Sequence, residues 1–179
     1  MTQTHVESKL EFQFKTGLEV VKFDESSFFT QHFNKLIGSK GVDFLVDDPE
    51  GNVLYFIEVK NFTGHETENK KRLKVNTEFS LALEVSQKVR DSISCLVGAY
   101  KMGNDTAIIP FFHRLRQHNV QVKVILFLEG AFHEEIKMFR AMSDEMKVRL
   151  NWLTTKVLIE NVRFAKESIY SISKAPYSS

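Results

Sequence analysis

The feature that most constrains the fold is a pair of apolar segments, residues 42–46 and 53–60, separated by the turn sequence Asp-Pro-Glu-Gly-Asn. Short apolar runs bounded by Gly and Pro are typical of buried strands. Each run nevertheless carries an acid, Asp43 in the first and Glu58 in the second. The two segments therefore predict a strand pair that is buried on both faces and still holds two carboxyl groups.

The turn predicts how these strands align. A two-residue loop at Glu50-Gly51 and a four-residue loop over residues 49–52 give the same register, with Asp43 directly opposite Glu58. Directly opposed residues share one face of a sheet, with Cβ atoms about 5 Å apart. Side chains alternate along a strand, so Lys60 lies on that face as well. We expect the three side chains to converge.

Such a cluster indicates metal chemistry. Two carboxylates this close repel each other unless a cation lies between them. Mg²⁺ binds carboxylates, waters and phosphate oxygens, and a nearby lysine can hold an attacking water or neutralise charge on a phosphate. The combination predicts phosphodiester hydrolysis that depends on Mg²⁺ or Mn²⁺. The alternative is an edge hairpin with solvated charges. The apolar runs argue against it because they indicate burial, and buried acids are costly unless they are paired or bound to a metal.

Gly41-Val42-Asp43-Phe44 followed by Ile57-Glu58-Val59-Lys60 resembles the motif of the PD-(D/E)xK nuclease superfamily, which has the restriction-endonuclease-like fold. The resemblance covers roughly residues 25–129 and implies a core of helix, antiparallel strands, helix and strand. It implies that Asp43, Glu58 and the carbonyl of Val59 hold the metal, and that Lys60 assists the nucleophilic water. Some members have lost catalysis, so an inactive module that binds nucleic acid or protein within a larger complex is the alternative.

The resemblance extends to two further places. Many members carry a polar residue on the helix beside the Glu strand, where this chain has Gln87 and Lys88; an ordinary Glu84–Lys88 helix pair is the alternative. Many members also carry an acid on the first helix, which makes Glu25 a candidate. A favourable charge at a helix start explains Glu25 better.

A basic cluster in the polar segment 63–76 is a candidate for contact with a phosphate backbone, and consists of Lys70, Lys71, Arg72 and Lys74. A solvated loop is the alternative, and the same two readings apply to the basic residues between positions 113 and 118. The formal net charge is only +1, so binding of nucleic acid, DNA in the first instance, requires a local basic surface.

Hydrophobic periodicity predicts the other elements. We expect a β-hairpin from residues 9–15 and 18–24, a mobile loop over 63–76, helices over 27–37, 77–100, 108–118 and 132–153, and strands over 120–128 and 156–162. The last strand, helix and strand suggest a parallel crossover. The helix stripes are expected to bury Phe79 and Ile136, and the tail after Ser168 to fray.

Together these elements predict one α/β domain over residues 1–179, with a mixed central sheet flanked by helices. The N-terminal hairpin and the C-terminal helix and strand are additions to the restriction-endonuclease-like core. That core usually has a strand between its first helix and the Asp strand. Only residues 38–41 separate them here, so the N-terminal hairpin is expected to supply the missing strand in space.

Several classes of protein are excluded by what the sequence lacks. Cys95 is the single cysteine, which rules out an intrachain disulfide and a cysteine zinc site. The histidines have no zinc-hydrolase spacing, and no Gly-rich phosphate loop is present. No signal peptide and no membrane span is recognisable, so we expect a cytoplasmic protein. Cleavage of both strands of DNA needs two sites, so we expect a homodimer through the N-terminal hairpin or the last helix and strand.

Overall fold

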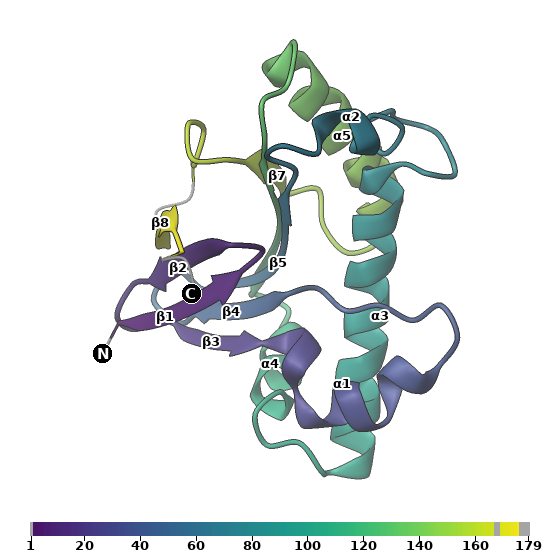
Figure 1. The fold of residues 1–179 in the computed structure, drawn as a ribbon. Helices are drawn as coiled ribbons and strands as arrows, with labels where there is room; N and C mark the ends of the chain where they lie inside the picture. The colour runs from purple at the N-terminus through teal and green to yellow at the C-terminus, as the bar shows by residue number, and fades with distance from the viewer. Residues whose placement is uncertain (1, 167–168, 176–179) are drawn as a thin grey trace.

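The computed structural model describes residues 2–166 and 169–175 and shows a mixed α/β fold with two sheets (Figure 1). The strands are β1 (Gln3–Glu7), β2 (Leu10–Phe14), β3 (Glu19–Lys22), β4 (Phe44–Asp48), β5 (Val53–Asn61), β6 (Gln121–Glu129), β7 (Val157–Glu160) and β8 (Tyr170–Lys174). The helices are α1 (Ser27–Gln31), α2 (Glu66–Asn69), α3 (Leu81–Met102), α4 (Ile109–Leu115) and α5 (Glu135–Leu150), with 3₁₀ turns η1 (Phe23–Glu25) and η2 (Phe33–Lys35).

The larger sheet has the strand order β3-β4-β5-β6-β7. Its first three strands are antiparallel to one another, whereas β5, β6 and β7 run parallel. The chain crosses from β5 to β6 through α3 and α4, and from β6 to β7 through α5. This arrangement confirms the predicted mixed sheet and the parallel strand pair at its end.

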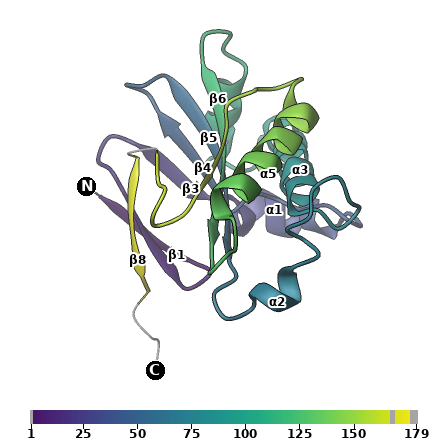
Figure 2. The ribbon, with the colours of Figure 1, turned by 90° about the horizontal axis from the view of Figure 1, so that it is seen from above.

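The molecule has three layers (Figure 2), with α1, α3 and α5 on one side of the larger sheet and the sheet of β1, β2 and β8 on the other. Leu45 and Phe56 face the helices and belong to the core on that side. Phe44 and Ile57 face the smaller sheet and pack in a second core with Phe12. Strands β4 and β5 are therefore buried on both faces, as their apolar runs predict.

The register of β4 and β5 is the predicted one. Asp48 pairs with Val53 across a four-residue loop, and Phe44 pairs with Ile57. The N–H of Gly51 donates to Oδ1 of Asp48 (2.9 Å) inside this loop. Asp43 lies just before this ladder, which ends at Phe44 and Ile57, and the Asp43 N–H donates to the carbonyl of Ile57 (3.1 Å), so the predicted pairing of Asp43 with Glu58 is not part of the ladder.

The predicted hairpin between residues 9–15 and 18–24 is wrong. β2 pairs with β1 through a turn at Ser8 and Lys9, which have φ angles of 51° and 64°, while β3 pairs with β4. Two central residues with positive φ make a turn whose twist suits a two-residue hairpin. Such turns usually contain Gly or Asn, and neither Ser8 nor Lys9 is one of these, so the sequence does not indicate the turn. β3 still supplies a strand beside β4, as expected of this region.

The tail after Ser168 is not frayed where it is described, because β8 pairs with β2 and Tyr170 is buried. Residues 167–168 and 176–179 lie outside the described residues. The predicted helix over 27–37 is two pieces, α1 and η2, interrupted at His32, whose φ of −122° is not helical. The loop over 63–76 contains the short helix α2.

The helices α3 and α5 are shorter than their periodicity predicts. α3 begins at Leu81, whose N–H donates to the carbonyl of Arg72 outside the helix. Phe79 precedes the helix, is 61% exposed and is not part of the core. Ile136 in the first turn of α5 is also exposed. Among the described residues, no helix combines the length and apolar character needed to cross a membrane.

Candidate functional site

Asp43 lies just before β4, where that strand meets β5. Its backbone N–H donates to the carbonyl of Ile57 (3.1 Å), and its Oδ2 accepts a hydrogen bond from the N–H of Val59 (2.6 Å). The residue is only 5% exposed. The two hydrogen bonds hold the Asp43 backbone and its carboxyl group against β5.

Glu58 is fully buried and accepts hydrogen bonds from two lysines at one oxygen. Its Oε1 lies 2.5 Å from Nζ of Lys60 and 2.6 Å from Nζ of Lys88. Nζ of Lys88 is also 3.8 Å from Oδ1 of Asp43. Both carboxylates therefore contact one ammonium group, which shows that they point to the same face.

The electrostatics of this cluster follow from burial and crowding. Burial raises the pKa of Asp43 to about 7, the charge of Glu58 adds to this, and Lys88 opposes it. Burial lowers the pKa of Lys60, but the carboxylates of Glu58 and Asp43 outweigh it, so the net shift of that pKa is upward. Lys60 is thus a charged hydrogen-bond donor here and not a proton acceptor.

Lys88 reaches the cluster from α3, whereas its neighbour Gln87 is exposed. The alternative pairing with Glu84 is not formed. Oε2 of Glu84 accepts a hydrogen bond from the guanidinium of Arg72 at 2.8 Å instead. The structure thus brings Lys88 to the two carboxylates and leaves Gln87 on the outer side of the helix.

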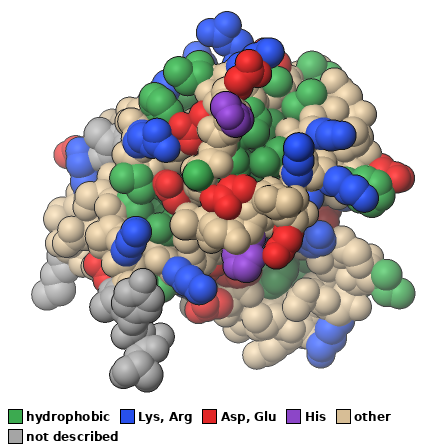
Figure 3. Space-filling model, turned by 45° about the horizontal axis from the view of Figure 1, so that its top comes forward, with side chains coloured by type: hydrophobic (Ala, Val, Ile, Leu, Met, Phe, Trp, Pro, Cys, Tyr) green, Lys and Arg blue, Asp and Glu red, His purple; other side chains and the backbone are tan. Residues whose placement is uncertain are grey.

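The four basic residues of the polar segment 63–76 differ in their surroundings. Lys70, Lys71 and Lys74 are exposed. Arg72 bonds to Asn69 and Glu84 and stacks over the ring of Phe62 at 5.1 Å, so it fastens this segment to α3. On the face shown in Figure 3, acidic, basic and apolar side chains are interspersed.

Val59 was expected to contribute its carbonyl oxygen. The N–H and C=O of one residue in a strand point to the same neighbour, so this carbonyl faces the side on which Asp43 receives the Val59 N–H. Glu25 is exposed and lies 2.5 Å from Lys22, away from the buried pair. Glu25 is therefore a surface charge in this structure.

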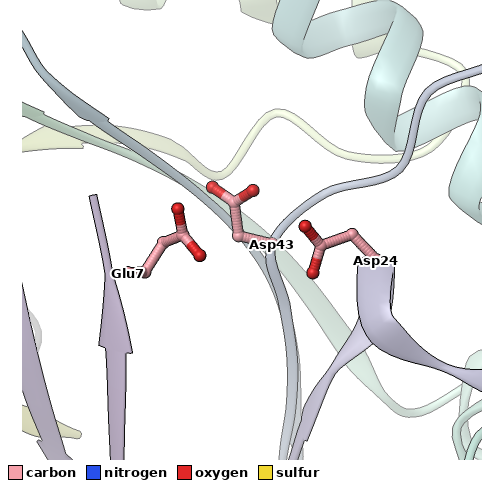
Figure 4. Close-up of side chains that lie close together, drawn as sticks. All are labelled: Glu7, Asp24 and Asp43. Atoms are coloured by element: carbon pink, nitrogen blue, oxygen red, sulfur yellow. The ribbon is translucent and has the colours of Figure 1, made fainter.

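Two acids of the cluster escaped prediction, Glu7 of β1 and Asp24 of η1. Each has a carboxylate oxygen within 4.8 Å of the other and of an Asp43 oxygen (Figure 4). Burial and the charge of Glu7 raise the pKa of Asp24. Asp24 adjoins the Glu25 that was considered, whereas nothing in the sequence pointed to Glu7, because β1 was not expected.

The oxygen atoms of the cluster fit a hard divalent cation in part. Oε2 of Glu58 and Oδ1 of Asp24 are buried and have no hydrogen-bond partner among the described residues. A bound cation and its waters would satisfy such oxygens. The ammonium group of Lys88 stands between Asp43 and Glu58, however, so a cation at that place requires this lysine to move.

Comparison with known proteins places the chain in a family. A model for a family of unknown function (DUF6661) matches residues 26–173. The chain belongs to this family. The DUF6661 match includes Asp43, Glu58, Lys60 and Lys88, while Glu7 and Asp24 precede it. No curated protein and no solved structure matches the chain.

Proposed function

We propose that this chain hydrolyses phosphodiester bonds in nucleic acid, DNA in the first instance, at a site where Asp43 and Glu58 hold Mg²⁺ or Mn²⁺. One observation carries the proposal. The carboxylates of Asp43, just before β4, and of Glu58 in β5 share the ammonium of Lys88, and Lys60 lies against Glu58. Charged groups are rarely gathered in the interior without a partner or a function.

The order of elements supports the resemblance to the PD-(D/E)xK superfamily. An antiparallel pair, β4 and β5, is followed by α3 and by β6, which lies parallel to β5. β3 lies beside β4 in the sheet but precedes α1 in the chain. The proposed restriction-endonuclease-like core therefore has its third strand in the expected place and in an unusual order.

The side chains have separable roles in this proposal. A divalent cation, when bound, supplies positive charge that acidifies a water and polarises the phosphate. Asp43 is held in place by the N–H of Val59. The charged Lys60 donates hydrogen bonds to the attacking water or to a phosphate oxygen. Lys88, once displaced from Asp43 and Glu58, carries its charge to the same phosphate.

A second candidate function is favoured by one observation. The ammonium of Lys88 already contacts both carboxylates, and thus takes the place of a cation. A chain in which this lysine stays in place is a nuclease-fold module without catalysis, which binds nucleic acid or protein. The two functions differ in whether the native chain binds a divalent cation.

Calorimetric titration with Mn²⁺ separates them. If the site is catalytic, native protein binds Mn²⁺ and Glu58→Ala loses the ion held at Asp43 and Glu58. If the inactive module is correct, native protein binds no Mn²⁺ at this pair, whereas Lys88→Met, which removes the ammonium and keeps the length of the side chain, gains binding there. Asp144→Asn, an exposed acid on α5, is the control and changes neither result.

Lys60→Ala tests the catalytic role directly. This variant should lose at least about 100-fold in the rate of Mn²⁺-dependent cleavage of labelled DNA, since one positioned charge in a buried site is worth this much. Its Mn²⁺ affinity should change little, because Lys60 is not a ligand. Full cleavage activity in Lys60→Ala would remove the triad from the reaction.

The homodimer also stays a prediction. Two-fold symmetry would give the two sites that cleavage of both strands requires. Several large apolar side chains on α5 and the segments beside it are exposed and available for such contact, namely Ile136, Val148, Trp152 and Val162. These residues favour the last helix and strand over the N-terminal hairpin as the contact surface.

A further inference from the structure

One edge of the larger sheet is a strand with an open side. β7 ends the strand order, and no described strand pairs with its outer edge. The carbonyl of Lys156 accepts a hydrogen bond from the N–H of Val124 in β6 (2.9 Å). Because backbone groups alternate in direction along a strand, those of Val157 and Ile159 point away from β6. Such an open row of donors and acceptors is a template for pairing with a further strand.

A groove runs along this edge, between β7 and α5. It consists of two adjoining cavities of about 400 and 540 Å³, which share Ile136, Arg140 and Phe164. The residues that α5 contributes recur every three or four positions from Ile136 to Lys147, so they form one face of the helix. A further strand paired with β7 would therefore lie in this groove, with α5 beside it.

One end of the groove is apolar and exposed. Ile136 and Phe164 line both cavities and are 64% and 36% exposed. Val162, between β7 and Phe164 in the chain, is 57% exposed. Large apolar side chains that are gathered on a surface and bordered by polar groups mark a site of contact with another molecule. This end suits one large apolar side chain of a ligand.

The charges that line the groove are mostly positive. Two ion pairs and one hydrogen bond satisfy part of them, namely Lys137–Glu134 (3.2 Å), Lys147–Asp144 (3.1 Å) and Asn161–Glu135 (2.7 Å). The remaining cations are Arg140, Arg163 and Lys166, which form no ion pair with another described residue. Three unpaired cations attract an acidic ligand and repel a second copy of the same groove.

We propose that this groove binds an extended acidic peptide of a partner protein, which adds a strand to β7. The peptide backbone pairs with the outward groups of Val157 and Ile159, and its carboxylates lie against Arg140 and the other unpaired cations. The four residues of β7 match about 13 Å of extended chain. A nucleic-acid backbone would use the cations but neither the strand edge nor the apolar end, so a peptide accounts for more of the groove.

The groove has no residue in common with the Asp43–Glu58 pair and needs no metal. Peptide binding is therefore expected whether or not the chain cleaves DNA. Val148 and Trp152 do not line the groove either, so a homodimer through these two residues would leave it open.

The test is fluorescence anisotropy of a labelled octapeptide of alternating glutamate and valine, titrated with the full chain in EDTA. Native protein should bind it. Arg140→Glu should weaken binding by at least about tenfold, since it removes an attractive charge and adds a repulsive one. Lys101→Glu is the matched control, because it changes the net charge equally at an exposed position of α3 that does not line the groove. Its affinity should equal that of native protein.

Two sets of altered peptides separate the backbone from the side chains. Replacement of each glutamate by lysine should abolish binding. Methylation of every second amide nitrogen removes the donors on one edge of an extended peptide, so of the two possible methylated peptides one should lose binding and the other should keep it. Equal binding of both methylated peptides overturns the pairing with β7.

The other outcomes are equally clear. Absence of octapeptide binding to native protein overturns the inference, and so does binding that Arg140→Glu leaves unchanged. Binding of labelled single-stranded DNA in place of the peptide, lost in Arg140→Glu, assigns the groove to nucleic acid and overturns it. A native dimer that excludes the peptide and that Ile136→Ser dissociates assigns the groove to a second copy and overturns it as well. Thermal unfolding of each variant establishes that it is folded.

Discussion

The surroundings of Asp43 have opposite effects on the charge of its carboxyl group. The N–H of Val59 favours its charged form, whereas burial and Glu58 favour its neutral form strongly enough to raise its pKa from 3.8 to about 7. A carboxyl group whose pKa is raised on folding stabilises the protein below its unfolded value, and that stability is lost as pH rises through the folded value. Without metal, Asp43 thus costs stability at neutral pH.

Asp43→Asn should therefore stabilise the metal-free protein at pH 8 relative to the native chain. Wild type should lose up to about 4 kcal/mol of unfolding free energy from this one group between pH 4 and pH 7, and the variant should not. Urea unfolding in EDTA at pH 4, pH 7 and pH 8 measures the difference. Asp144→Asn, at an exposed position, is the control. Equal pH dependence in wild type and Asp43→Asn would contradict this account.

Cys95 is a buried titratable group whose surroundings favour only its neutral form. It is fully buried in α3, and burial raises the pKa of its thiol to about 12, with a smaller contribution from Asp105. Reaction with a disulfide reagent at pH 8 should therefore be slow in the folded protein and should follow unfolding as urea is added. In Ser94→Cys the neighbouring exposed thiol should react at once. Rapid reaction of native Cys95 would show that α3 opens locally.

At the scale of elements, strands β4 and β5 were predictable because their signals are local. Apolar runs, a Pro-Glu-Gly turn and a period of two place Asp43, Glu58 and Lys60 without knowledge of the rest. Lys88 followed only from resemblance. Glu7 was out of reach, since its place depends on β1 lying over the larger sheet, and pairing between distant segments leaves no pattern within either of them.

The turn between β1 and β2 shows why that hairpin was missed, and it offers a test. Lys9 has a φ of 64°, a conformation that costs a side chain free energy and suits Gly. Lys9→Gly should raise the unfolding free energy by up to about 1 kcal/mol. Lys15→Gly, at an exposed position without positive φ, should lower it by about 0.5–1 kcal/mol. Thermal denaturation of both variants measures these changes. Equal losses of stability in Lys9→Gly and Lys15→Gly would contradict the positive φ of Lys9 in this turn.

At the scale of the whole molecule, the two sheets share one core. The ring of Phe12 in the smaller sheet lies 5.7 Å from that of Phe44 and 5.3 Å from that of Phe127, both in the larger sheet, measured between ring centroids. All three side chains are fully buried. The smaller sheet should therefore unfold together with the rest of the molecule.

Phe12→Ala should lower the unfolding free energy by about 3–5 kcal/mol and keep a single transition. Val6→Ala, on the same hairpin but 49% exposed, should change it by less than about 0.5 kcal/mol. Circular dichroism and tryptophan fluorescence, followed together in urea, report on both sheets and on Trp152. Two separate transitions in Phe12→Ala would mean that the smaller sheet is an independent unit.

β2 is the central strand of the smaller sheet, between β1 and β8. Its two partner strands are synthesised at different times. β1 directly precedes β2 in the chain, whereas β8 follows some 160 residues later. At about 5–20 residues per second, a ribosome needs roughly 10–30 s to bridge that gap. During this interval the apolar face of a two-stranded ribbon is exposed, and isolated hairpins are barely stable. A chain in which β8 is not yet made therefore holds Glu7 less firmly beside Asp43, because β1 lies over the larger sheet as part of the three-stranded sheet that β8 completes.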